Sequence, residues 1–93
     1  MSEALEVSVV IPCLNEEETI GECIKKALIG FEKAGILGEV VVVDNGSTDR
    51  SKEIAESLGA RVVREEKKGY GNALRRGFEE AMGRYILMGD ADN

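Results

Sequence analysis

Four short apolar segments recur along the chain, and a longer segment with a helical pattern separates each one from the next. The segments are Val7–Ile11, Val40–Val43, Ala60–Val63 and Tyr85–Met88. The first two are nearly continuous β-branched runs, as is typical of strands that are buried on both faces. Strands that alternate with single helices require right-handed crossovers and a parallel sheet. The sequence therefore predicts an α/β domain with three layers, α/β/α, around a four-stranded parallel sheet.

The first helical segment has one apolar face. Its apolar residues recur at helical spacing: Ile20, Ile24, Ala27, Leu28 and Phe31. Asn15 precedes Glu18 by three residues, which is the spacing of a capping box, so we expect Asn15 to cap this helix. We expect its end to be marked by Gly30, Gly35 and Gly38.

Two further helices follow from the same reasoning. Asp49 closes the turn sequence Asn-Gly-Ser-Thr-Asp and is a candidate N-cap for the second helix, which is expected to stop at Gly59. The third helix is expected after Gly71. Its apolar face consists of Leu74, Phe78, Ala81 and Met82.

Composition limits the functions that are open to the chain. Its 93 residues suffice for one domain, spanning 1–93, and its net charge of −6 disfavours nucleic-acid binding. The absence of His removes Ser-His and Cys-His catalytic pairs. We interpret Cys13 and Cys23 as free buried thiols in a reducing compartment, so we expect a cytoplasmic protein. No apolar run approaches the roughly 20 residues of a membrane span, and no basic signal region precedes the first strand.

The unusual polar residues of the chain follow the ends of the predicted strands. In sheets of this kind, ligands bind outside the carboxyl ends of the strands. The segments at these ends are Pro12–Glu17, Asp44–Asp49, Arg64–Gly71 and Gly89–Asn93. We therefore expect them to form one polar rim.

Asp90 and Asp92 follow the last predicted strand after a single glycine. Carboxylate oxygens suit Mg²⁺ and Mn²⁺, so the pair is a candidate site for a divalent ion and a sugar nucleotide. The alternative is that both are solvated acids, which are common at protein surfaces. Their placement on the shared rim favours the binding site.

Other features of the rim allow both a binding and a structural interpretation. Asp44 either accepts hydrogen bonds from a base or sugar, or bonds the backbone of its own turn. The glycines of Gly69-Tyr70-Gly71 either admit a diphosphate to the start of a helix or form only a flexible loop. Nearby basic residues can add positive potential: Lys67, Lys68, Arg75 and Arg76. The alternative for Arg75 and Arg76 is a solvated helix face.

Three other classes of α/β protein fit the loops poorly. A dinucleotide-binding fold requires GxGxxG after the first strand, where this chain has Pro-Cys-Leu-Asn-Glu-Glu-Glu. The P-loop sequence GxxxxGK[ST] is absent. A phospho-accepting receiver domain requires Asp after the third strand, where Val63 and Arg64 stand.

Four motifs follow one another along the chain: Val-Ser-Val-Val-Ile-Pro-Cys-Leu-Asn-Glu-Glu, Val-Val-Val-Asp-Asn-Gly-Ser-Thr-Asp, Gly-Tyr-Gly-Asn-Ala and Gly-Asp-Ala-Asp. Together they resemble the start of inverting family 2 glycosyltransferases of the GT-A fold, particularly the dolichyl-phosphate mannose or glucose synthases. The resemblance runs from Val7 to Asn93. It implies a Rossmann-like parallel sheet with strand order 3-2-1-4, and hexose transfer from a UDP- or GDP-sugar.

The resemblance also implies roles for individual residues. It assigns these positions to nucleotide binding: Pro12, Leu14, Glu16, Asp44, Gly71, Asp90 and Ala91. Asp90 and Asp92 match the DxD motif, which holds Mg²⁺ or Mn²⁺ on the diphosphate. The metal would neutralise the leaving diphosphate while an acceptor attacks the sugar. Family members often have Tyr where this chain has Leu14.

Family members continue well beyond Asn93, and their acceptor site and catalytic base lie in that continuation. We therefore expect the nucleotide-binding half of such an enzyme, with no catalytic residue in this chain and little activity alone. A polyprenyl phosphate at a membrane would be the acceptor of the full-length enzyme. A non-catalytic nucleotide-binding module and an excised folding unit are the alternatives. Because an exposed strand at Tyr85–Met88 would recruit partners, we expect a homo-oligomer.

Overall fold

The computed structural model describes residues 4–91. Its elements are β1 (Val7–Cys13), α1 (Ile20–Ala34), β2 (Gly38–Asp44), α2 (Ser51–Ser57), β3 (Arg61–Arg64), α3 (Tyr70–Glu80) and β4 (Tyr85–Met88). This is the alternation that the apolar pattern predicted. None of the helices in residues 4–91 is long and apolar enough to span a membrane.

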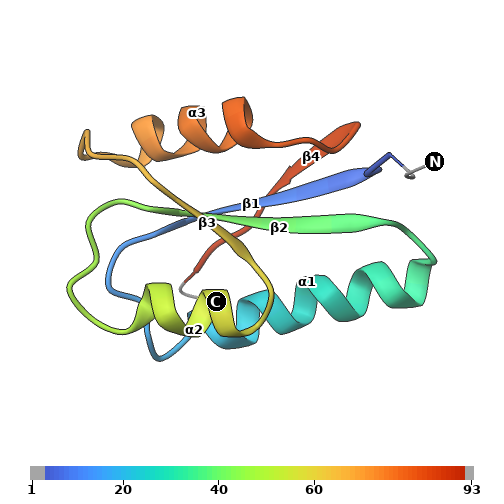
Figure 1. Ribbon diagram of the computed structural model, residues 1–93, viewed down its shortest axis with the longest axis horizontal. Helices are drawn as coiled ribbons and strands as arrows, with labels where there is room; N and C mark the ends of the chain where they lie inside the picture. Colours follow the sequence, from blue (N-terminus) through green and yellow to red (C-terminus); the bar gives the residue numbers. More distant parts are fainter. Residues whose placement is uncertain (1–3, 92–93) are drawn as a thin grey trace.

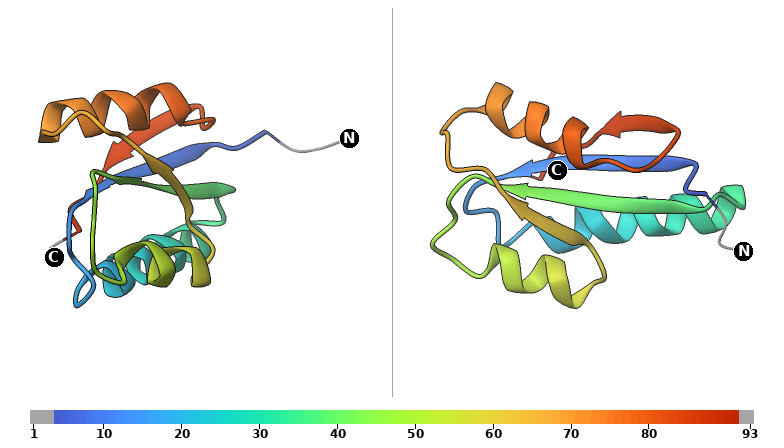
Figure 2. Two further views of the ribbon diagram at one scale, coloured as in Figure 1. Left: turned by 60° about the vertical axis from the view of Figure 1, so that its left-hand side comes forward. Right: turned by 45° about the horizontal axis from the view of Figure 1, so that its top comes forward.

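The four strands form one parallel sheet in the order β3-β2-β1-β4, which confirms the predicted order. β1 pairs with β2 along its whole length and with β4 over Val7–Val10. α1 and α2 cover one face of the sheet, and α3 covers the other (Figure 1). Figure 2 shows the same three layers from two further directions. The predicted α/β/α architecture is therefore confirmed.

β1 continues through Pro12, where the sequence was expected to end the strand. Proline lacks an N–H group, so a strand tolerates it only where that side of the strand is unpaired. The Gly89 N–H donates to the Val10 carbonyl at 2.9 Å, so Val10 and Pro12 both direct their main-chain groups toward β4. The pairing of β4 with β1 ends at Val10. Pro12 therefore removes no hydrogen bond of the sheet.

The predicted capping box at Asn15 is wrong. α1 has Thr19 as its N-cap residue, and no side chain caps this end. Asn15 instead has a left-handed φ of 52°, and its Oδ1 accepts the Thr48 N–H at 2.8 Å. At the other end, Gly30 lies within the helix, which stops at Gly35 in the left-handed conformation, with a φ of 66°.

Other predicted boundaries shift slightly. Arg50 is the N-cap residue of α2, so the prediction that Asp49 caps this helix is wrong by one position. The Asp49 carboxylate still accepts the Ser51 N–H, at 2.9 Å. α3 begins at Tyr70, before Gly71, and β3 begins one residue later than predicted. Boundary shifts of this size leave the topology unchanged.

The sheet buries apolar side chains on both faces. Val10, Val41 and Val43 are completely buried in the cluster beneath α3, and Ile11 packs in the cluster beneath α1 and α2. Full burial of one such side chain contributes about 1.5–3 kcal/mol relative to exposure. α3 lies close to the sheet because Gly77 has no side chain, and a Cβ there would overlap Val10. The two clusters hold the three layers together.

Glu39, on β2, fastens the turn between α3 and β4. Its Oε2 accepts hydrogen bonds from the Ser8 hydroxyl at 2.6 Å and from the Met82 N–H at 2.8 Å. Arg61 Nη2 lies 3.3 Å from Glu39 Oε1. Burial by itself raises the pKa of Glu39, but these hydrogen bonds and the Arg61 charge outweigh burial and lower the pKa below its ordinary value. The charged form of Glu39 therefore stabilises the fold.

We expect Glu39→Gln to lower the free energy of unfolding at neutral pH by about 1–2 kcal/mol, since glutamine keeps only one acceptor oxygen. Because the folded-state pKa of Glu39 is lowered, its contribution is present above the ordinary pKa of 4.5 and is lost as the pH falls through the folded-state pKa. Urea unfolding at several pH values measures this contribution. Glu56→Gln removes an exposed charge from α2 and is the control. A difference between Glu39→Gln and the parent that persists at acid pH would contradict this role.

Candidate functional site

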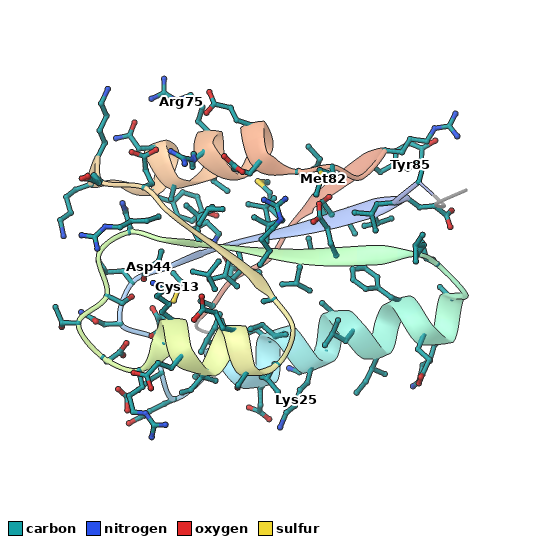
Figure 3. The ribbon with its side chains drawn as sticks, in the orientation of Figure 1. Cys13, Lys25, Asp44, Arg75, Met82 and Tyr85 are labelled. Carbon is teal, nitrogen blue, oxygen red and sulfur yellow. The ribbon has the colours of Figure 1, made fainter. Side chains whose placement is uncertain are left out.

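A cavity of about 310 Å³ lies at the carboxyl ends of the strands. Its walls are Pro12, Cys13, Leu14, Glu16, Asn45, Lys68, Gly69, Tyr70, Ala73, Asp90 and Ala91. In Figure 3, Cys13 and Asp44 mark this end of the sheet, and Tyr85 lies at the other end. The walls come from the β1–α1 loop, the turn after β2, the start of α3 and the segment after β4. The expected polar rim is therefore one hollowed site.

Most of the residues predicted to bind a nucleotide converge on this cavity. The predicted residues that line it are Pro12, Leu14, Glu16, Asp90 and Ala91. Asp44 and Gly71 are not part of this lining, although each is next to a residue that is. Asp92, which was predicted to hold a metal with Asp90, lies outside the described residues.

The Asp44 carboxylate holds the turn that follows β2. This residue is only 5% exposed, and the Ser47 N–H lies 3.2 and 3.3 Å from its two oxygens. The sequence allowed two roles for Asp44, nucleotide binding and a bond to the backbone of its own turn, and this contact is the second of them. Asp44 therefore shapes the turn that carries Asn45, its neighbour in sequence, which lines the cavity.

Asn45 is a site residue that sequence reasoning missed. Its amide nitrogen donates to the Glu65 and Lys67 carbonyls at 2.8 and 2.9 Å, and its Oδ1 accepts the Gly69 N–H at 3.0 Å. Both donor hydrogens and the oxygen of this buried amide thus hold the loop before α3 against the rim. In the sequence, Asn45-Gly46 indicates only a turn, so this longer-range role had no local signal.

Two loops on the rim also hold each other. Asn15 Oδ1 accepts the Thr48 N–H at 2.8 Å, and the Glu16 N–H donates to Ser51 Oγ at 2.8 Å. These bonds join the β1–α1 loop to the start of α2. They satisfy main-chain donors that have no partner in the sheet. The loop that places Leu14 and Glu16 in the cavity wall is therefore held by hydrogen bonds to the segment at the start of α2.

Neither cysteine forms a disulfide, as expected. Cys13 is buried and lines the cavity, whereas Cys23 is only half-buried. Burial raises the pKa of the Cys13 thiol above its ordinary value, because the interior disfavours the thiolate. Since the thiolate is the nucleophilic form of cysteine, Cys13 is a neutral wall of the cavity.

The charged groups of the lining suit a phosphorylated ligand with a divalent cation. Glu16 and Asp90 contribute carboxylates, and Lys68 contributes a cationic side chain. Within residues 4–91, no three His, Cys, Asp or Glu side chains form a group that could hold a metal ion. Mg²⁺ does not require three protein ligands, because one or two carboxylates together with substrate phosphates usually hold it. The oxygen donors present therefore fit a cation that arrives with its ligand.

Comparison with known proteins decides the family. Residues 8–93 match the profile of Glycosyl transferase family 2. The chain belongs to this family. The match includes every segment that lines the cavity, and it confirms the resemblance carried by the four motifs. Residues 8–93 correspond to the nucleotide-sugar-binding region of the family.

Curated family 2 relatives include sugar transferases that are much longer than this chain. The low-salt glycan biosynthesis hexosyltransferase Agl6 of Haloferax volcanii is 51% identical over 86 residues, which cover 92% of this chain and 21% of that protein. The undecaprenyl-phosphate 4-deoxy-4-formamido-L-arabinose transferase of Edwardsiella ictaluri is 38% identical over 93 residues, covering 92% and 29%. The chain thus spans about a fifth to three tenths of the length of these relatives.

A solved family 2 structure shares the fold. Glucosyl-3-phosphoglycerate synthase from Mycobacterium tuberculosis, in complex with Mn²⁺, UDP and glucosyl-3-phosphoglycerate, superimposes with a TM-score of 0.77 at 34% identity. The alignment covers 94% of this chain and 33% of that one. This similarity confirms the GT-A fold class. It also shows that a homologous enzyme binds UDP together with a divalent cation.

We expect Asn45→Asp to lower the free energy of unfolding by about 1–3 kcal/mol, because a carboxylate cannot donate to the Glu65 and Lys67 carbonyls. The Gly69 amide should also exchange its hydrogen faster. Urea unfolding and hydrogen exchange measure the two effects. Asn72→Asp, which removes one exposed donor from the same region, should have a smaller effect and is the matched control. Unchanged exchange at Gly69 in Asn45→Asp would contradict the role given to Asn45.

Proposed function

We propose that this chain binds a nucleotide-diphosphate sugar in the cavity at the carboxyl ends of its strands. It would serve as the donor-binding domain, residues 1–93, of an inverting hexosyltransferase. The observation that carries this proposal is the convergence of residues from separate loops on one cavity: Pro12, Leu14, Glu16, Asp90 and Ala91. Family membership supplies the class of ligand.

The walls of the cavity suit different parts of such a ligand. Pro12 and Leu14 present apolar surface for a base or ribose, and Glu16 offers a carboxylate to sugar hydroxyls. The nucleotide contacts predicted for Asp44 and Gly71 stay predictions, since neither residue is part of the lining. In our proposal, these two residues shape the rim through their neighbours Asn45 and Tyr70, which line the cavity.

The diphosphate would lie beside Asp90 together with Mg²⁺ or Mn²⁺. Asp90 and Asp92 would hold the cation, and Ala91 between them would contact the nucleotide. When bound, the cation supplies positive charge that stabilises the leaving diphosphate. Lys68 contributes further positive charge to the lining, which supports an anionic ligand.

The names of relatives support the class of donor and acceptor. The M. tuberculosis synthase was solved with UDP and Mn²⁺, which favours a UDP-hexose over a GDP-hexose as donor. The E. ictaluri relative is named as an undecaprenyl-phosphate transferase, which supports a polyprenyl phosphate acceptor for a full-length enzyme. The relatives are several times longer than this chain. We therefore assign donor binding to this chain and sugar transfer to groups outside it.

Isothermal titration with UDP and GDP, each with and without Mn²⁺, tests the proposal. We expect UDP to bind and Mn²⁺ to strengthen the binding. Asp90→Asn should weaken the Mn²⁺-dependent binding by about tenfold or more, since losing a charged contact costs about 1.5–3 kcal/mol. Glu56→Gln removes an exposed acid from α2, outside the lining, and should leave the affinity unchanged.

Other outcomes would favour the alternatives. No binding of either nucleotide at about millimolar concentration would contradict the proposal and favour an excised folding unit. If the nucleotide affinity changes neither with Mn²⁺ nor in Asp90→Asn, a non-catalytic module with a different ligand geometry is favoured. Sugar transfer by the purified chain to a polyprenyl phosphate would contradict the assignment of transfer to groups outside it.

We also propose that a second copy of the chain covers the exposed edge of the sheet at β4. The apolar and aromatic side chains of this strand, Tyr85–Met88, are 40–63% exposed. Within the described sheet β4 pairs only with β1, so its outer edge presents unpaired main-chain groups. An exposed strand edge of this kind is a template for pairing with another strand.

Charge complementarity favours a second copy in antiparallel orientation. Arg84 lies directly before β4 and Asp90 shortly after it, and both are exposed. If two β4 strands pair about a twofold axis at Leu87, the Arg84 that precedes one strand comes near the Asp90 that follows the other. Opposite charges that meet across a strand pair favour this orientation. A twofold dimer with one continuous sheet follows.

Analytical ultracentrifugation tests the interface. We expect a dimer for the parent chain and a monomer for Leu87→Lys, because lysine would place a charge on the twofold axis. Ile29→Lys, at an exposed apolar position on α1, is the matched control and should stay dimeric. Arg84→Asp should weaken the dimer, and adding Asp90→Arg should restore it. A monomeric parent chain, or a dimer that tolerates Leu87→Lys, would contradict this interface.

A further inference from the structure

Thr19 makes an unusual hydrogen bond at the start of α1. It is the N-cap residue of this helix, yet its side chain makes no capping bond. A threonine hydroxyl at an N-cap ordinarily accepts an N–H of the first helical turn. Here Oγ1 donates instead to the carbonyl of Ala91, 2.5 Å away, across 72 residues of sequence. The hydroxyl therefore joins α1 to the segment after β4.

This bond fixes Ala91 from a second side. The Ala91 side chain is only 5% exposed and packs in the core cluster with Ile20 and Ile24. Its carbonyl is held by Thr19. Ala91 and the exposed Asp90 before it both line the cavity. The segment that presents Asp90 is thus anchored by its neighbour.

The sheet does not supply this anchoring. β4 pairs with β1 only as far as Met88, and the next hydrogen bond runs from the Gly89 N–H to the Val10 carbonyl. Beyond that bond, the described main chain follows no strand. The Thr19 hydroxyl is therefore a polar contact that fixes the chain beyond the end of the sheet.

A weaker contact of Thr19 does not compete with this one. Oγ1 also lies 3.5 Å from Glu16 Oε2, but a hydroxyl has a single hydrogen to donate. The shorter contact, to Ala91, takes that hydrogen. The Glu16 carboxylate consequently keeps its acceptor capacity for the cavity that it lines.

We propose that Thr19 is a positioning residue for the cation and diphosphate of the nucleotide ligand. Its hydroxyl holds the Asp90-Ala91 segment so that the Asp90 carboxylate meets the metal–diphosphate group without rearrangement. Thr19 itself is not part of the cavity lining and acts only through Ala91. This inference rests on the proposed nucleotide-sugar binding.

Titration of Thr19 variants with UDP, with and without Mn²⁺, tests the inference. Thr19→Val keeps the shape of the side chain and removes the hydroxyl, so Mn²⁺-dependent UDP binding should weaken about three- to tenfold, the scale of one hydrogen bond. Metal-free UDP binding should change less. Thr19→Ser keeps the hydroxyl and should restore the parent affinity. Ser57→Ala removes an exposed hydroxyl from α2, outside the lining, and should bind like the parent.

Thermal unfolding of the same variants separates positioning from stability. A lower Tm for Thr19→Val with full Mn²⁺-dependent affinity well below that Tm would overturn the inference. Equal losses with and without Mn²⁺ would also overturn it. If Thr19→Val does not fold, Thr19→Ala removes the same hydroxyl with less bulk and gives the same comparison. Failure of the parent chain to bind UDP would instead contradict the proposed function, so the two failures are distinguishable.

Discussion

β1 and β2 pair in parallel over their full lengths, Val7–Cys13 with Gly38–Asp44, and helices cover both faces of the pair. Val10 and Val41 face each other in this register and are completely buried. Burial of each contributes about 1.5–3 kcal/mol, so the pair forms the centre of the cluster beneath α3, while their neighbours Ile11 and Val42 belong to the cluster on the other face. Because the strands are parallel, they end side by side, and the loops that follow them meet at one edge. The position of the cavity is a consequence of this pairing.

Polar side chains then connect loops that the sheet leaves unpaired. Asn15 binds the turn before α2, Asn45 binds the loop before α3, and Thr19 binds the segment after β4. Each is a side-chain-to-main-chain hydrogen bond between segments that are distant in sequence. Such bonds satisfy main-chain groups and also stiffen the cavity walls. A stiff site loses less conformational entropy when a ligand binds, which suits a flexible, charged nucleotide sugar.

The fold was predictable because it depends on patterns that are local in sequence. The run Val40–Val43 indicates a buried strand wherever it occurs, and strand–helix alternation fixes the parallel topology. Asp44, Asp90 and Asp92 stood out because they follow predicted strands, whereas the nucleotide-binding roles of Pro12, Leu14 and Glu16 came from family resemblance. The capping role of Asn15 was wrong because such a side chain satisfies a near or a remote N–H equally well. The roles of Asn45 and Thr19 depend on partners 20 to 72 residues away, which local sequence does not encode.

The central claim is that a nucleotide diphosphate with its cation binds in the cavity at the carboxyl ends of the strands. Amide NMR spectra recorded during titration with UDP and Mg²⁺ test this claim most directly. We predict shifts at Leu14, Asn45, Gly69 and Ala91, which line the cavity, and none at Met82, in the turn that Glu39 fastens at the other end of the sheet. Shifts confined to that turn, or no shifts at saturating UDP, would contradict the claim.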